Sequence, residues 1–209
     1  MKTIEALKWR YATKRFDSTK SISNESLENL KEAIQLTATS YGLQPFKVIV
    51  VQDKETKTKL RAAAYNQPQL EEADAIFVFC NQLSPGNKEI DDYIQNISDT
   101  RNFPVENLKG FEDYMKGAVN GISESDKAVW TAKQTYIALG SLLIAAGELH
   151  IDACPMEGFE PGGFNEILGL KEKGLNAAVI AAVGYRSSED QTQFLTKVRK
   201  SKEDLFLTV

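Results

Sequence analysis

The chain has 209 residues, of which 42% are hydrophobic and 26% charged, a composition typical of one compact domain, or of one domain with an excursion. Its formal net charge of -4 argues against nucleic acid as the main partner, because phosphate backbones require a basic face. With one histidine, His150, and two cysteines, Cys80 and Cys154, in separate apolar runs, the sequence excludes a structural zinc site, and we expect no metal.

The sequence also predicts where the protein resides. Residues 1–5 lack the charged and apolar regions of a signal peptide, and no run of about 18 apolar residues occurs. Both cysteines are expected to be buried thiols of a reducing compartment rather than a disulfide. We therefore expect a cytoplasmic protein without a membrane partner.

The first part of the chain alternates helical and strand patterns. Ser23 is typical of a helix N-cap, and apolar residues follow it at helical spacing, so we expect a helix that ends near residues 37–40. Short apolar, β-branched runs predict two buried strands with a helix between them. These three elements are expected at Phe46–Val51, residues 54–64 and Ala75–Cys80.

The middle of the chain changes character twice. Residues 81–125 are polar and weakly patterned, with helices expected at about 88–97 and 105–119. We interpret residues 1–209 as a single domain from which this region is an excursion. Ser123 then caps the longest predicted helix, which runs to about Leu149 and is apolar on nearly all faces in its second half. Such a helix is buried either by the chain's own helices or by a second subunit.

The last part continues the alternation, which is the signature of α and β elements packed in layers. Strands are expected at Asp152–Cys154 and Ala177–Gly184, with a helix near Gly163–Leu168 between them. The segment Leu205–Val209 is apolar and β-prone. Because a loose apolar end is prone to aggregation, we expect it to pair with the chain's own sheet or with a partner's.

Motifs of several common enzyme classes are missing. No glycine-rich dinucleotide or phosphate loop follows a strand, and no serine nucleophile elbow occurs. Instead, cations gather at both ends of the chain, in Arg10–Arg15 and Lys197–Lys200. In a protein of negative net charge, this grouping points to a small anionic ligand. Hydroxyl, amide and Gly/Pro segments between these groups complete a distributed set of candidate binding residues.

These residues resemble those of the flavin-dependent nitroreductase family, particularly the oxygen-insensitive NAD(P)H nitroreductases and dihydropteridine reductases of enteric bacteria. The resemblance extends over nearly the whole chain and rests on motifs in the family's order. They are Arg10–Phe16, Gln44-Pro45 before an aromatic residue, Asn66, Trp130–Tyr136, Pro155–Phe159, Gly169–Gly174 and Lys197-x-Arg199. The resemblance implies an α+β fold of three α-β-α layers, with a mixed sheet around a long central helix, in an intertwined homodimer.

The family resemblance also implies FMN at the dimer interface, reduced by NADH or NADPH, and gives the matched residues roles. Lys14 would stabilise charge near flavin N1, and the Glu157-Gly158 backbone would approach N5, which makes Lys14 and Glu157 the candidate catalytic residues. Thr39, Ser40 and Gln44 would come from the partner subunit. The full cofactor-binding set is Arg10, Tyr11, Ala12, Lys14, Thr39, Ser40, Gln44, Asn66, Gln69, Pro155, Met156, Glu157, Gly158, Lys197 and Arg199.

The implied reaction is two-electron transfer from NAD(P)H to nitroaromatics or quinones in a ping-pong cycle. Tyr41 and Phe111 are the candidate substrate residues, and the region at 81–125 would cover the substrate side. Enone or pteridine reduction on the same scaffold, or a flavin-binding protein without turnover, remain alternatives. Five positions depart from the family's pattern: Tyr11, Ala12, Gly42, Leu43 and Gln69. The region 100–125 is also longer than the family's, and because this region usually covers the substrate face, substrate preference stays open.

Overall fold

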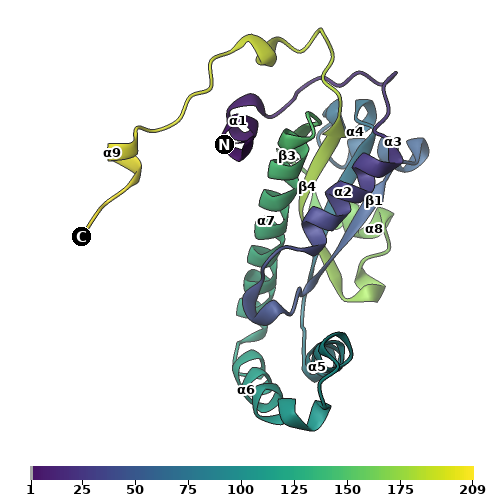
Figure 1. The fold of residues 1–209 in the computed structure, drawn as a ribbon. Helices are drawn as coiled ribbons and strands as arrows, with labels where there is room; N and C mark the ends of the chain where they lie inside the picture. The colour runs from purple at the N-terminus through teal and green to yellow at the C-terminus, as the bar shows by residue number, and fades with distance from the viewer. Residues whose placement is uncertain (1) are drawn as a thin grey trace.

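A four-stranded sheet lies at the centre of the computed structural model, which describes residues 2–209 (Figure 1). Its strand order is β1-β2-β4-β3, and each neighbouring pair is antiparallel. The central strands are buried apolar runs, because helices cover both faces of the sheet. The strands are β1 Phe46–Val51, β2 Ala75–Gln82, β3 Asp152–Met156 and β4 Leu175–Gly184.

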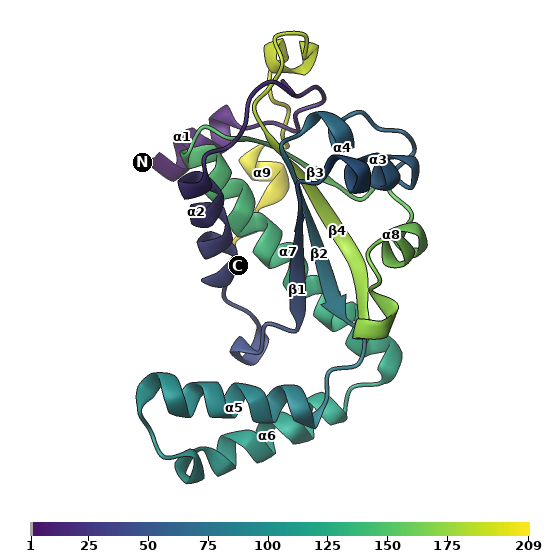
Figure 2. The same ribbon diagram turned by 90° about the vertical axis from the view of Figure 1, so that its right-hand side faces the viewer.

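Two helical layers enclose this sheet (Figure 2). One contains α2 (Asn24–Gln35) and α7 (Glu124–Glu148), and α1 (Lys2–Trp9) packs on α7. The other contains α3 (Lys54–Ala62), α4 (Gln69–Glu72) and α8 (Pro161–Ile167). Side chains of a strand alternate between faces, so Phe77 and Phe79 pack with the first layer and Ile76 and Val78 with the second. The expected three-layer α+β architecture is therefore confirmed.

The long helices begin where the sequence predicts. The hydroxyls of Ser23 and Ser123 accept hydrogen bonds from the backbone N–H groups of Ser26 and Asp126, which are otherwise unpaired in a first helical turn. Helix α2 ends at Gln35, a few residues before the predicted end at residues 37–40. Leu36 caps the last turn, with its N–H donating to the Glu32 carbonyl, and the chain then enters the loop that contains the left-handed Tyr41.

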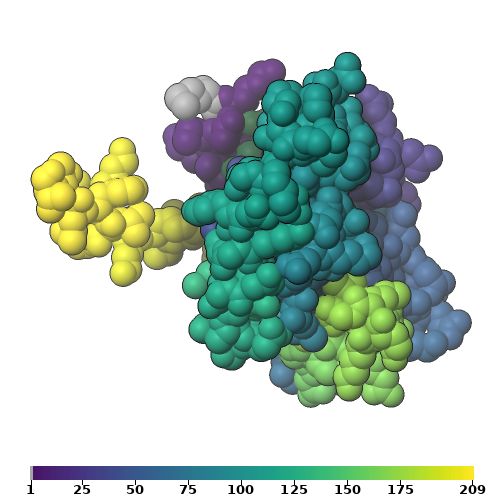
Figure 3. Space-filling view, turned by 90° about the horizontal axis from the view of Figure 1, so that it is seen from below, coloured from purple at the N-terminus to yellow at the C-terminus, as the bar shows by residue number. Residues whose placement is uncertain are grey.

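The region expected as an excursion forms a helical hairpin beyond one end of the sheet (Figure 2). It consists of α5 (Asn87–Arg101), a 3-10 turn (Val105–Leu108) and α6 (Lys109–Asn120). The hairpin has its own apolar core, made by Ile90, Ile94, Ile97, Met115 and Val119 together with Leu43 from the loop after α2. Viewed from below, it covers the sheet end of the molecule (Figure 3).

The expectation of a mixed sheet is corrected for the strands of this chain. The three strand pairs are antiparallel, and a parallel contact occurs as the isolated bridge between Ala12 and Ala153. Alternation of strands and helices along the sequence does not fix strand direction. Direction depends on whether a connection returns the chain to the end of the sheet that it left, as the connections from β1 to β2 and from β3 to β4 do.

The C-terminal segment leaves the body after β4. It forms a 3-10 turn at Gln191–Phe194 and the short α9 (Lys202–Leu205), and then projects away from the sheet (Figures 1 and 3). The apolar end is exposed, with Leu207 at 95% of its maximum. Pairing of Leu205–Val209 with the chain's own sheet is therefore wrong, and pairing with a partner's sheet stays a prediction. Across residues 2–209, no helix has both the length and the apolar character needed to span a bilayer.

Candidate flavin site

The segment that carries Arg10 and Lys14 is fixed across one end of the sheet. Ala12 forms a bridge with Ala153 of β3, and Phe16, which is buried, forms a bridge with Arg186 after β4. The N–H of Asp17 donates to the carbonyl of Tyr185 at 2.8 Å. The predicted cationic segment is thus an ordered part of the sheet end rather than a free loop.

A buried carboxylate, Asp190, fixes the segment Arg10–Phe16 by accepting hydrogen bonds from it. Its side chain is 1% exposed and accepts hydrogen bonds from the Lys14 N–H at 2.8 Å, the Tyr11 hydroxyl at 3.0 Å and the Thr192 N–H at 2.9 Å. Burial alone raises the pKa of Asp190, but these hydrogen bonds outweigh it and leave the pKa below its ordinary value. Burial and the bond to Asp190 raise the pKa of Tyr11 to about 12.

A second buried carboxylate, Asp152 of β3, contacts the same segment through the Thr13 hydroxyl and also pairs with Arg186. It accepts from Arg186 Nε at 2.8 Å and from the Arg186 backbone N–H at 2.9 Å. The Arg186 guanidinium lies over the rings of Trp9 and Tyr11, 4.4 and 4.7 Å from their centres. Neither Asp152 nor Asp190 was predicted from the sequence, because residue type alone does not show which carboxylates are buried.

The side chains of four cations lie at this end of the sheet and have no carboxylate partner among the described residues. Within residues 2–209, none of Arg10, Lys14, Lys197 and Arg199 forms an ion pair. Burial, and next the charge of Arg199, lower the pKa of Arg10. Burial, and next the charges of Arg10 and Arg199, lower the pKa of Lys197. Repelling cations held together at one end of a sheet are suited to binding an anion.

Lys197 differs from the other three cations in what it contacts. Its ammonium donates to the carbonyls of Leu7, Lys8 and Arg10, at the C-terminal end of α1. This arrangement ties the C-terminal segment to α1 and uses the three donors of the ammonium. Any contact between Lys197 and a phosphate must therefore be shared with these carbonyls, whereas Arg199 donates to a single carbonyl, that of its neighbour Val198, at 2.6 Å, and the buried Nε of Arg10 has no partner among the described residues.

The floor of the site comes from β3 and the start of α4. The Lys14 ammonium lies 3.9 Å from the Cys154 thiol, next to Pro155 and the buried Met156. Gln69 is buried, and its Oε1 has no hydrogen-bond partner; the same is true of the buried Nε of Arg10. Unpaired buried polar atoms are costly, and their presence at the predicted cofactor position fits a site that a polar ligand completes.

The loop after β3 offers backbone donors at the same place. Among the described residues, the N–H groups of Glu157 and Gly158 donate to no protein acceptor. The Glu157 carboxylate accepts from the Tyr136 hydroxyl of α7 at 2.7 Å. Burial and this bond raise the pKa of Tyr136 to about 12. Asn66, in the turn before α4, is exposed and has left-handed backbone, with a φ of 57°.

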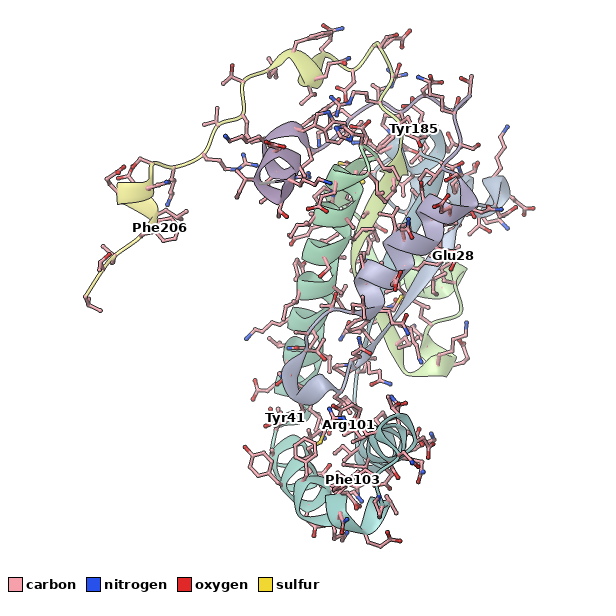
Figure 4. All side chains as sticks on the ribbon, viewed as in Figure 1. Glu28, Tyr41, Arg101, Phe103, Tyr185 and Phe206 are labelled. Atoms are coloured by element: carbon pink, nitrogen blue, oxygen red, sulfur yellow. The ribbon has the colours of Figure 1, made fainter. Side chains whose placement is uncertain are left out.

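The remaining predicted residues lie at the opposite end of the chain's sheet. The Thr39 hydroxyl accepts from the Gln44 N–H at 3.0 Å, and the Ser40 N–H donates to Gln134 of α7 at 2.9 Å. Figure 4 shows Tyr41 beside α6, far from Tyr185, which marks the end with the cationic segment. One chain therefore does not unite Thr39, Ser40 and Gln44 with Arg10 and Lys14.

The two candidate substrate residues belong to an aromatic group at this second end. Tyr41 makes edge contacts with Tyr114 of α6 and Trp130 of α7, with ring centres 6.1 and 6.5 Å apart. Phe111 is exposed on α6. Phe103 is exposed on the same hairpin (Figure 4). These side chains could stack on a planar molecule, but they lie away from the cations of their own chain.

A search against family models matches residues 7–185 of this chain to the nitroreductase family. The chain belongs to the nitroreductase family. Its relatives include YfkO of Bacillus subtilis, named provisionally as an NAD(P)H nitroreductase, at 33% identity over 97% of this chain and 95% of that protein. The major NAD(P)H-flavin oxidoreductase of Aliivibrio fischeri is 32% identical over 97% of this chain and 96% of its own length. The resemblance predicted from the motifs is thereby confirmed.

Solved structures share the fold at lower sequence identity. The Bacillus subtilis protein ydfN superposes with a TM-score of 0.88 at 17% identity, covering 99% of this chain and 98% of its own. A protein of Exiguobacterium sibiricum, described provisionally as a nitroreductase and crystallised with FMN, superposes with a TM-score of 0.85 at 19% identity, covering 99% and 97%. At these identities the likeness establishes the fold.

Proposed function

We propose that this protein is a homodimeric FMN-dependent oxidoreductase that transfers two electrons from NADH or NADPH to small aromatic acceptors such as nitroaromatics or quinones. The observation that carries the proposal is the group of unpaired cations and free backbone donors at one end of the sheet, at the positions that the family motifs indicate. The names of relatives at 32–33% identity support NAD(P)H and a flavin as the reactants.

The residues present fit FMN by their chemistry. The guanidinium groups of Arg10 and Arg199 suit its phosphate, and the unpaired Oε1 of Gln69 and the exposed Asn66 suit the polar edge of its ring. When bound, FMN supplies an atom, N5, that accepts and gives hydride. Lys14 lies at the floor of the site and forms no ion pair within residues 2–209, so no carboxylate of this chain competes with the ring for its ammonium.

The chain's own contribution to the reaction is electrostatic and positional. The Lys14 ammonium stabilises negative charge that develops on the ring, and the N–H groups of Glu157 and Gly158 orient its other edge. Tyr41 and Phe111 of the partner hold a planar acceptor by stacking. No residue needs to act as a strong general acid or base, which agrees with the lack of an obvious acid-base pair in the sequence.

Apolar surfaces that one chain leaves exposed support the proposed homodimer. Helix α7 presents Val129, Ile137 and Ile144 to solvent at helical spacing, with exposed fractions of 53%, 48% and 37%. We propose that pairing two such faces brings Thr39, Ser40 and Gln44 of one subunit beside the cations of the other. Strand β1 is an edge strand of apolar sequence, and we propose that the partner's Leu205–Val209 pairs with it as the parallel component expected for the sheet.

The cheapest test is the absorbance spectrum of the purified protein. We expect a yellow protein whose flavin absorbance is lost with NADH or NADPH under anaerobic conditions and returns with a nitroaromatic or a quinone. A colourless protein that does not take up FMN would overturn the proposal. A yellow protein that neither nicotinamide reduces would identify a flavin-binding protein without turnover. Two free, buried cysteines agree with the reducing cytoplasm that we propose as its location.

A further inference from the structure

Gln67, which lies next to the predicted flavin residue Asn66, joins the turn before α4 to the loop after β3. Its Nε2 donates to the carbonyl of Gly158 at 2.6 Å and to the carbonyl of Ala64 at 3.1 Å. An amide nitrogen has two hydrogens, and these two contacts use both. One side chain therefore connects the two segments.

The turn that presents Gln67 has an unfavourable backbone. Tyr65 and Asn66 are consecutive non-glycine residues in the left-handed region, with φ of 53° and 57°. Residues in such conformations cost of order 1–3 kcal/mol each and persist where their surroundings determine them. Here Arg61 holds the turn, since its Nε donates to the Asn66 carbonyl and its own carbonyl accepts from the Asn66 N–H. The strained turn directs Gln67 at Gly158.

The contact at Gly158 controls the orientation of a second peptide group. The peptide between Gly158 and Phe159 is held at both ends, by Gln67 at its carbonyl and by the bond from the Phe159 N–H to the Glu157 carbonyl at 2.9 Å. The Glu157 carbonyl belongs to the preceding peptide, whose N–H is that of Gly158. Because the carbonyl and N–H of a trans peptide point in opposite directions, fixing this carbonyl fixes the direction of the free Gly158 N–H.

We propose that Gln67 is a positioning residue for the flavin reaction: it holds the loop in the conformation in which the Gly158 N–H faces the ring. The proposal rests on the function proposed above. A Cβ at position 158 would lie 3.2 Å from Gln67 Nε2, so a side chain there would require Gln67 to shift.

The test compares Gln67→Ala and Gln67→Glu with the wild type and with Gln95→Ala, which removes an exposed glutamine of α5. One arm measures hydrogen exchange of the Phe159 amide in protein without FMN. The other measures the rate of anaerobic flavin reduction and the flavin midpoint potential in protein saturated with FMN. Thermal unfolding of each variant separates a local effect from a general loss of stability.

We expect exchange at Phe159 to accelerate and reduction to slow by about threefold to tenfold in Gln67→Ala, the range of one neutral hydrogen bond. Gln67→Glu, which places an acceptor against the Gly158 carbonyl, should show at least the same loss and a shifted potential, while Gln95→Ala matches wild type. Unchanged exchange, or faster exchange with an unchanged reduction rate and potential, would overturn the proposal. A wild-type protein that binds no FMN would instead refute the proposed function, and the exchange arm would still decide whether Gln67 holds the loop.

Discussion

The two ends of the sheet are built by different means. At the cationic end, buried acids hold the backbone: Asp190 accepts from Lys14 and Asp152 pairs with Arg186. At the aromatic end, the loop after α2 has left-handed backbone at Tyr41, Gly42 and Gln44, and Tyr114, the aromatic neighbour of Tyr41 on α6, is exposed. The difference supports our proposal that one chain supplies the anion-binding half of a site and that a second chain supplies the other half.

The largest effect is expected from removing the phosphate cations. Arg10→Ala combined with Arg199→Ala should weaken FMN binding by about 10²–10⁴-fold, because a hydrogen bond to a charged group contributes about 1.5–3 kcal/mol and two are lost. Titration of the apoprotein with FMN, followed by flavin fluorescence, measures the change. Lys171→Ala with Lys173→Ala removes the same charge elsewhere and should bind normally. Equal affinities in both variants would remove the cationic end from the site.

The next effect is on rate rather than affinity. Lys14→Ala should slow flavin reduction by about 10²–10³-fold in protein saturated with FMN, the usual cost of losing one preorganised group that stabilises developing charge. Stopped-flow mixing with NADH or NADPH measures it, and Lys20→Ala, at an exposed cation paired with Asp17, is the control. A Lys14→Ala protein that is reduced at the wild-type rate would show that this ammonium does not face the ring.

A smaller effect tests the rigidity of the cationic end. The pKa of Asp190 is lowered in the folded protein, so its ionised form adds stability above the unfolded pKa of about 3.9, and this stability is lost as the pH falls through the folded value. Asp190→Asn should lose roughly 1–3 kcal/mol of unfolding free energy at pH 7 and show a flatter decline in acid. Urea unfolding between pH 3 and 7 measures both, with the exposed Glu203→Gln as control. Parallel curves for the two variants would contradict a supporting role for Asp190.

Much of the fold could be predicted because its signals are local. Ser23 and Ser123 mark helix starts by a hydroxyl that reaches its own first turn, and the apolar runs of β1 and β2 fix strands by their length. The end of α2 was predicted a few residues late, because no glycine or proline directly follows Gln35 to mark the place where the chain leaves the helix. Strand direction could not be predicted, since it depends on the path of the connections.

Only some residues of the candidate site could be predicted from the sequence. Arg10, Lys14 and Arg199 were predicted because cations gather at both ends of an acidic chain and match the family's motifs. Asp190 and Gln67 were missed because their roles depend on partners that lie far away in sequence, 176 and 91 positions for their bonds to Lys14 and Gly158. Such supporting residues have no pattern of their own and become visible only when the fold brings their partners together.

The central claim is that each site combines the cationic end of one chain with the aromatic end of another. It is tested by complementation between Arg10→Ala/Arg199→Ala and Ser40→Trp, the second adding bulk where the partner's loop would meet the ring. Each variant alone should lack NAD(P)H-dependent flavin reduction. Co-expressed with different affinity tags, the mixed dimer contains one site with intact cations and an intact loop, and we expect about half the wild-type activity per dimer. A mixed dimer as inactive as its parents would contradict a site shared between chains.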